Sequence, residues 1–343
     1  MKMTKRTLIK AMSAALVMGT AIGSVGLAQA AEKRSYVLAT ASTGGTFYPV
    51  GVALATLTKV KLEPTLGISM SAINSAGSGE NIKLMRENEA QLSILQGLYG
   101  AWAWDGEGRM ASEGPQKNLR SISMLWQNVE QFVVKKEHAK KGDLSDLLAL
   151  TGEKVAFGKK NSGTIGSNRF LLGNLGLDID KQMSLFSAGY GPSAEALQNG
   201  QVEAINTPAG APTGAVTKLF AAAADDISPL DVTDQQIEQV NGGLDLWTRY
   251  VIPAGTYPNL DQDWNTIAQP NFLAVHADVD EEFVYLLTKT IYENLGFLQA
   301  IHKATSAMAL NKALAGLPAP LHPGAVRYYR EAGLDIPERL IAK

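Results

Sequence analysis

The stretch ATASTGGTFYP, residues 39–49, places two adjacent glycines between hydroxyl side chains, just before a proline. An apolar run at 35–39 predicts a strand before it, and 49–60 predicts a helix after it, because proline suits the first helical turn. A glycine-hydroxyl loop at the start of a helix presents unpaired backbone N–H groups and small O–H groups. The stretch therefore predicts a strand–loop–helix unit that faces something anionic or strongly polar.

The same order of elements recurs along the chain. Further strands are expected at 68–73, 90–97, 119–126, 129–136, 154–158, 183–189 and 202–207, and further helices at 80–88, 164–174, 192–199, 213–222 and 281–302. Strand–loop–helix units in both halves of a chain indicate parallel sheets covered by helices. The sequence therefore predicts an α/β fold.

The N-terminus has the pattern of an export signal. A basic start, MKMTKRTLIK, precedes an uncharged run and the small-residue motif Ala28-Gln29-Ala30. This order predicts a cleavable signal peptide at 1–30. A membrane anchor is the alternative reading, but glycines and small polar residues dilute the run. Removing 30 of the 343 residues leaves 313, enough for two domains of ordinary size.

Composition narrows the class of protein further. The chain has no cysteine, which excludes both disulfides and a lipid-modified cysteine anchor. Its 31 basic and 33 acidic residues are dispersed, so no basic stripe predicts binding to nucleic acid or to a lipid surface. We expect a freely diffusing periplasmic protein.

Three glycine-hydroxyl loops, at 40–46, 74–79 and 161–164, follow expected strands. In α/β sheets, ligands bind beyond the carboxyl ends of the strands, so we expect these loops to face one another across a cleft. Their hydroxyls can donate to a ligand or simply cap the following helices. These side chains are Thr43, Thr46, Ser75, Ser78, Ser162 and Thr164.

The loops fit binding better than nucleotide chemistry, catalysis or metal coordination. They contain neither a P-loop nor a G-x-G-x-x-G motif. All four histidines, His138, His276, His302 and His322, lie outside them, and the sequence has no G-x-S-x-G elbow or H-E-x-x-H motif. We therefore expect no catalytic residue, no metal and no cofactor. An exported enzyme on the same fold remains a rival reading.

Several motifs resemble the TAXI family of periplasmic solute-binding proteins, which serve TRAP transporters. The resemblance runs nearly end to end. It rests on TGGTFYP (43–49), NSAGSGENIKLM (74–85), VAFGKKNSGT (155–164), VIPAGTYPN (251–259) and GLPAPLHPGAVRYYREAG (316–333).

The resemblance implies a type II periplasmic binding protein with two lobes, each with a mainly parallel sheet flanked by helices. Lobe 1 would comprise 31–127 plus 268–343 and lobe 2 would comprise 128–267, with hinges near 125–130 and 268–274. Such a monomer would close over a small carboxylate or amino acid, glutamate-like or a C4/C5 dicarboxylate. It would deliver this ligand to a TRAP membrane permease driven by an ion gradient. A periplasmic protein that presents its solute to a membrane sensor kinase is the alternative.

By the same resemblance, the ligand site draws on both lobes. Its residues would be Thr43, Gly44, Gly45, Thr46, Tyr48, Ala76, Gly77, Ser78, Gln96, Ser162, Gly163, Thr164, Tyr190, Ala209, Gly210 and Pro212.

Two departures from the family pattern bear on the ligand. Gln96-Gly97-Leu98 stands where the family often has Q-S-D, which removes a polar residue. Lys159-Lys160-Asn161 replaces small residues before S-G-T, and Arg169 follows in the next helix. Each of these cations could pair with a second carboxylate of the ligand or remain solvated.

Overall fold

The computed structural model describes residues 33–342, which belong to one compact unit. The expected signal peptide, residues 1–30, lies outside the described residues. Within the described part of the chain, no helix is both long enough and apolar enough to cross a membrane.

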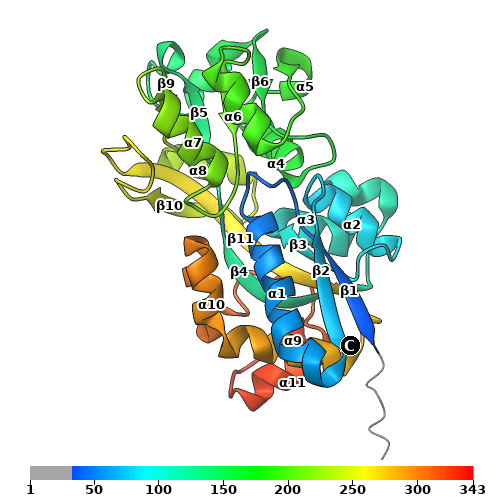
Figure 1. Ribbon diagram of the computed structural model, residues 1–343. Helices are drawn as coiled ribbons and strands as arrows, with labels where there is room; N and C mark the ends of the chain where they lie inside the picture. Colours follow the sequence, from blue (N-terminus) through cyan, green and yellow to red (C-terminus); the bar gives the residue numbers. More distant parts are fainter. Residues whose placement is uncertain (1–32, 343) are drawn as a thin grey trace, which may run out of the picture. The chain divides into compact units, whose positions relative to one another are not determined.

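The first sheet carries the glycine-hydroxyl loop at 40–46, which connects β1 (Arg34–Ala39) to α1 (Phe47–Leu66) (Figure 1). In spatial order it contains β10 (Thr248–Ile252), β11 (Trp264–His276), β3 (Leu92–Gln96), β1 (Arg34–Ala39) and β2 (Ile68–Ile73), and β4 (Leu119–Val129) also pairs with β11. β1 runs parallel to β2 and β3, whereas β11 is antiparallel to β3, β4 and β10. Every residue of β3 is buried, as expected for a central strand covered on both faces.

The second sheet has the same mixed character. Its order is β7 (Ser184–Leu185), β6 (Lys154–Ala156), β8 (Ala204–Asn206), β5 (Phe132–Lys135) and β9 (Ile227–Pro229). β6 is parallel to β7 and β8, and β5 is antiparallel to β8 and β9.

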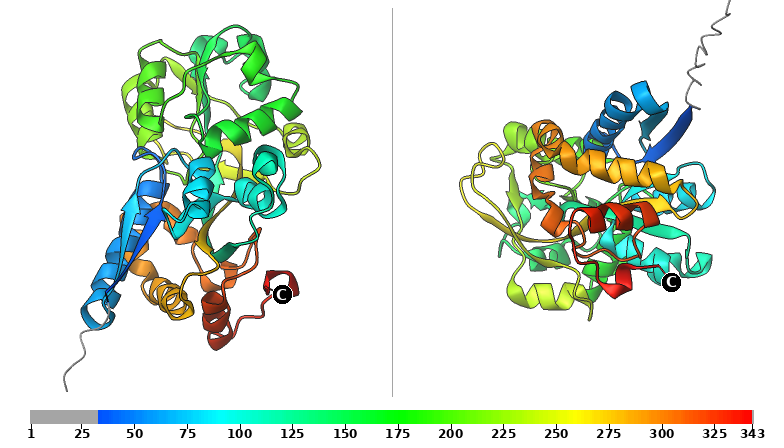
Figure 2. Two further views of the ribbon diagram at one scale, coloured as in Figure 1. Left: turned by 90° about the vertical axis from the view of Figure 1, so that its right-hand side faces the viewer. Right: turned by 90° about the horizontal axis from the view of Figure 1, so that it is seen from below.

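Helices cover both sheets. Around the first sheet are α1 (Phe47–Leu66), α2 (Ser78–Arg86), α3 (Gly97–Asp105), α9 (Glu281–Glu293), α10 (Leu295–Ile301) and α11 (Pro323–Glu331). Around the second are α4 (Gly163–Asn174), α5 (Ile179–Gln182), α6 (Tyr190–Gln198), α7 (Gly214–Ala223) and α8 (Asp234–Asn241). Figure 2 shows α9 and α11 side by side, and α2 lies against α4 where the two groups of helices meet. Short 3₁₀ helices occupy Gly108–Glu113, Lys136–His138, Leu144–Leu150, Lys303–Ala307, Leu310–Lys312 and Glu338–Leu340.

The chain passes between the sheets at two places. β4 ends at Val129 and β5 of the other sheet begins at Phe132. The return runs from β9 of the second sheet, which ends at Pro229, to β10 of the first sheet, which begins at Thr248. The hinge predicted at 125–130 includes the start of the first connection, whereas the one predicted at 268–274 lies within β11. The lobe boundaries and the hinge motion themselves stay predictions.

The α/β fold of type II periplasmic binding proteins is confirmed, with some local differences. Both sheets are mixed rather than mainly parallel, because β11 in the first sheet and β5 in the second run antiparallel to their neighbours. The helix expected at 281–302 is two helices that meet at Asn294, whose φ of −131° is not helical. The strand expected at 183–189 is reduced to Ser184–Leu185.

Candidate functional site

The loops at the carboxyl ends of the strands enclose one small cavity. The volume available to the centre of a water-sized group is about 30 Å³, so the cavity is small. From the first sheet's loops come Ala41, Ser42, Gly45, Thr46, Phe47, Ala76, Gly77, Ser78 and Gln96. From the second sheet's loops come Lys159, Ser162, Gly163, Thr164, Ala188, Gly189, Tyr190, Pro208 and Ala209.

Most of the residues expected in the site line this cavity. They are Gly45, Thr46, Ala76, Gly77, Ser78, Gln96, Ser162, Gly163, Thr164, Tyr190 and Ala209. Their role in binding stays a prediction, but the structure does bring them together from both sheets.

Thr43, Gly44, Tyr48, Gly210 and Pro212 are not among the lining residues. Thr43 is exposed. The carbonyls of Gly44 and Gly210 are bonded to the Ala215 N–H (3.2 Å) and the Thr46 hydroxyl (2.8 Å). Pro212 lines a separate pocket with Tyr250.

Seven lining residues are absent from the expected ligand set: Ala41, Ser42, Phe47, Lys159, Ala188, Gly189 and Pro208. Gly189 could have been found, because the helix expected after it gives the same strand–loop–helix signal. Lys159 could also have been found, because a charged residue there departs from the small residues of the TAXI family pattern before S-G-T.

Helix N-termini converge on the cavity. Lining residues include the first residues or N-caps of α1, α2, α4 and α6, and Gln96 is the N-cap of α3. The first-turn amides of a helix have no acceptor within that helix, and the helix dipole adds partial positive charge at this end. Two of these amides already donate within the protein. The Glu80 N–H donates to the Asn161 carbonyl (3.0 Å), and the Ile165 N–H donates to Ser162 Oγ (3.1 Å). The amides before them, at Ser78, Gly79, Gly163 and Thr164, therefore suit an anion.

Three of the lining hydroxyls are committed to the protein itself. Tyr190 donates to the Pro208 carbonyl (2.7 Å), so Thr164 Oγ1, 2.7 Å from the Tyr190 oxygen, is the donor in that second bond. Burial raises the pKa of Tyr190, which stays neutral. Thr46 likewise donates to Gly210. These three groups fix the walls of the cavity.

Ser78 and Ser162 keep their hydroxyl hydrogens for another partner. Ser78 Oγ accepts from the Gln96 N–H (3.1 Å), and Ser162 Oγ accepts from the Ile165 N–H as the cap of α4. In both bonds the hydroxyl is the acceptor, so its hydrogen remains available. The sequence left two roles open for these hydroxyls, donor to a ligand or helix cap. Ser162 can serve in both roles at once.

Gln96 supplies an unsatisfied acceptor. Its side chain is buried, and its Oε1 has no hydrogen-bond partner among the described residues. Buried polar atoms are nearly always paired, so an orphaned one calls for an explanation. A ligand that carries an O–H or N–H group would provide the missing donor.

Direct contacts join the two sides of the cavity. Tyr99 Oη donates to the Ser162 carbonyl (3.3 Å), and the Glu80 amide donates to the Asn161 carbonyl. A Cβ placed on Gly163 would lie 2.3 Å from Gln96 Oε1. The structure is therefore a closed arrangement that depends on glycine at this point of close approach.

The arrangement does not form a base–nucleophile pair. His302 Nε2 lies 3.5 Å from Thr46 Oγ1, and His302 Nδ1 accepts from the Ala304 N–H (3.1 Å). In the neutral ring, Nε2 therefore carries the hydrogen and cannot accept the proton of Thr46. Burial lowers the pKa of His302, which favours this neutral form.

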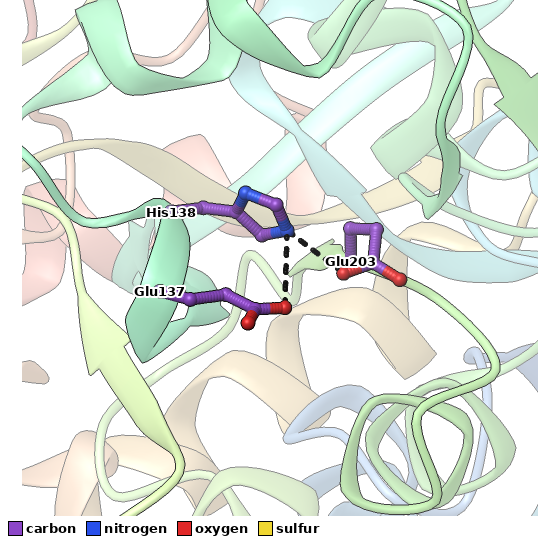
Figure 3. Close-up of side chains that lie close together, drawn as sticks. All are labelled: Glu137, His138 and Glu203. Atoms are coloured by element: carbon purple, nitrogen blue, oxygen red, sulfur yellow. Dashed lines mark hydrogen bonds and ion pairs between the residues drawn. The ribbon is translucent and has the colours of Figure 1, made fainter.

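A second cluster lies outside the cavity. Glu137, His138 and Glu203 bring three potential metal ligands within 4.8 Å of one another (Figure 3). Glu203, however, is already bonded to Lys135 Nζ (2.8 Å) and to His138 Nε2 (2.9 Å), and these partners hold the pKa of its carboxyl below the usual value. The cluster is therefore satisfied as an ion-pair network.

Solved structures share the fold. MatC from Rhodopseudomonas palustris, solved with bound malate, is 17% identical with a TM-score of 0.52, over 87% of this chain and 98% of that one. A protein from Bordetella bronchiseptica RB50 is 18% identical with a TM-score of 0.52, over 87% and 82%. At these identities the likeness concerns the fold alone.

The family comparison covers most of the chain. The model of the NMT1-like family matches residues 38–333, a span that includes every element around the cavity. The protein described here therefore belongs to the NMT1-like family.

Proposed function

We propose that this protein is a periplasmic solute-binding protein that captures a small carboxylate or amino acid. Glutamate-like compounds and C4/C5 dicarboxylates are the ligand class. One observation carries the proposal: helix N-termini from both sheets converge on one compact cavity, and the described residues that line it include a lysine and no acidic residue. Such a cavity favours negative charge.

The polar groups of the cavity refine the ligand class. Amides and the two free hydroxyls of Ser78 and Ser162 suit carboxylate oxygens, and Gln96 Oε1 suits a hydroxyl or ammonium donor. A hydroxy acid or an amino acid meets both demands. Malate, the compound bound to MatC, is one such molecule and is a natural probe.

The mechanism is closure of the two groups of loops over the ligand. A ligand drives closure only through contacts that improve in the closed form, and donors from both sides provide that difference. Micromolar binding needs roughly 8 kcal/mol net. Several charge-assisted hydrogen bonds of about 1.5–3 kcal/mol each can supply it against the costs of association.

The direct test is a thermal-shift screen on residues 31–343, refolded to remove bound solute. Malate, succinate, glutamate and 2-oxoglutarate are compared with a sugar and a divalent metal. At a hundred times Kd, the true ligand should add about 2.7 kcal/mol to the free energy of unfolding. A response to the sugar or the metal, with none to any carboxylate, would overturn the ligand class.

The proposed partner is a TRAP-type membrane permease, supported by the TAXI-like motifs TGGTFYP and GLPAPLHPGAVRYYREAG. Uptake of the ligand should then fail when the ion gradient is collapsed and survive ATP depletion. If the signal peptide is cleaved on export, the mature protein should begin at Ala31. This protein should be a monomer and should release its ligand chemically unchanged. Uptake that requires ATP, or turnover of the ligand, would contradict this part of the proposal.

A further inference from the structure

Among the described residues that line the cavity, Lys159 alone is charged, and it is an exposed residue. It precedes the loop that leads into α4, and its carbonyl accepts from the Ser162 amide (3.0 Å). Within the described residues, no carboxylate oxygen lies within 4.0 Å of its ammonium group. Its ammonium group therefore has no carboxylate partner among these residues and is left to solvent.

The neighbouring cations are arranged differently. Arg169 makes a two-pronged contact with Asp180, with both N–O distances at 2.7 Å. Lys160 and Arg109 line another pocket, of about 240 Å³, with Tyr99. Lys160 thus offers a matched lysine, one residue away, that does not reach the ligand cavity.

The acidic groups nearest the cavity are engaged elsewhere. Glu80 Oε2 accepts from the Ala76 amide (2.5 Å). Glu130 is fully buried, where Asn206 and Trp247 donate to its carboxyl. Neither Glu80 nor Glu130 appears in the cavity lining, so neither is placed to neutralise Lys159.

We propose that Lys159 is a specificity-determining residue that pairs with a second negative group on the ligand. This inference rests on the proposed function. The helix N-termini can hold one carboxylate through amides, which are neutral donors. A second carboxylate in the same small cavity needs a full positive charge, because burying an unpaired anion is costly. Lysine on its flexible stem provides such a point charge, so it selects for charge more than for shape.

The test compares ligands that differ only in that charge. Succinate is paired with its monoamide succinamate, and glutamate with glutamine, in calorimetric titrations of stripped protein. Wild type should bind the better dicarboxylate at least about tenfold more tightly than its amide, as for a charge-assisted hydrogen bond. Lys159→Met should reduce that ratio to within about twofold. Lys160→Met should leave the ratio unchanged, and Lys159→Arg should restore most of it.

Salt provides a second readout that a merely structural role would not move. Raising the ionic strength should weaken dicarboxylate binding to wild type more than to Lys159→Met, because partly exposed charge pairs are screened. A wild-type ratio in Lys159→Met, or equal binding of acid and amide by wild type, would overturn the inference while leaving carboxylate binding intact. If wild type bound no carboxylate at all, the proposed function would fail and this inference with it.

Discussion

At the scale of single residues, Gly163 decides whether the cavity can close. A Cβ there would lie 2.3 Å from Gln96 Oε1 and 2.9 Å from Ser78 Oγ, both on the opposite side of the cavity. The clash would exist only in the closed arrangement, so Gly163→Ala should leave folding intact and obstruct closure. We expect affinity for the carboxylate to fall at least about tenfold, equivalent to about 1.4 kcal/mol, in calorimetry.

Gly173→Ala is the matched control, because it lies on the same helix, α4, with no atom within 4 Å of the added Cβ. It should bind like wild type. Equal affinities in the two variants would show that close approach at Gly163 is not needed for binding.

Glu130 should make stability depend on pH. It is completely buried where the chain crosses between the sheets, and burial raises the pKa of its carboxyl to about 7, against bonds from Asn206 and Trp247 that lower it. Between pH 4.5 and 7 the folded chain then binds more protons at this site than the unfolded chain. Its stabilising contribution is full at low pH and is lost as the pH rises through 7, by up to about 3 kcal/mol.

Chemical denaturation at pH 5 and pH 8 measures this effect. Burial lowers the pKa values of His302 and His322, so they act in the opposite direction and make stability rise with pH. The comparison is therefore between wild type and Glu130→Gln, which should remove the component that falls with pH. Parallel pH profiles for the two proteins would refute the assignment.

At the scale of elements, we predict that Ser162 links the stability of α4 to binding. Its hydroxyl oxygen caps the helix, which leaves the hydrogen available to a ligand in the cavity that Ser162 lines. Ser162→Ala should lower the free energy of unfolding by about 1 kcal/mol and also weaken ligand binding. Thr233→Ala removes the comparable cap of α8, outside the cavity, and should lower stability alone. Denaturation and calorimetry on both variants separate the roles; unchanged affinity in Ser162→Ala would exclude the hydroxyl as a ligand donor.

The elements also show what local sequence can and cannot predict. The strand expected at 68–73 matches β2, because its ends are set by local signals such as Gly67 at the C-cap of α1, with φ 66°. The helix α3 was not predicted, since its glycines obscure the apolar pattern; Gly100 is required there by Phe272, whose ring would lie 2.5 Å from a Cβ.

The same limit applies to the site. The glycine-hydroxyl loops were predicted as one site, and they do meet around one cavity. Which hydroxyl is free was not predictable, because Thr46 donates to a carbonyl 164 residues away in sequence. The place of Lys159 in the lining likewise depends on the loops' tertiary approach.

At the scale of the whole described unit, the proposed closure predicts that contacts between the two sides set the balance between open and closed forms. Tyr99 spans the cleft through its bond to the Ser162 carbonyl. Tyr99→Phe removes one hydrogen bond, worth about 0.5–1.5 kcal/mol, from the closed form only. Ligand affinity should fall by roughly two- to tenfold, and small-angle scattering should show a larger radius of gyration without ligand. Unchanged affinity and radius would mean that this bond does not contribute to closure.

The central claim is that both sides of the cavity hold one small anion between them. Native mass spectrometry of residues 31–343, purified without refolding, tests it most directly when wild type is compared with Gly163→Ala. The account predicts a bound small carboxylate on wild type, identified by its released mass, and its loss or strong depletion in the variant. A neutral solute on wild type, or a carboxylate retained equally by both proteins, would contradict it.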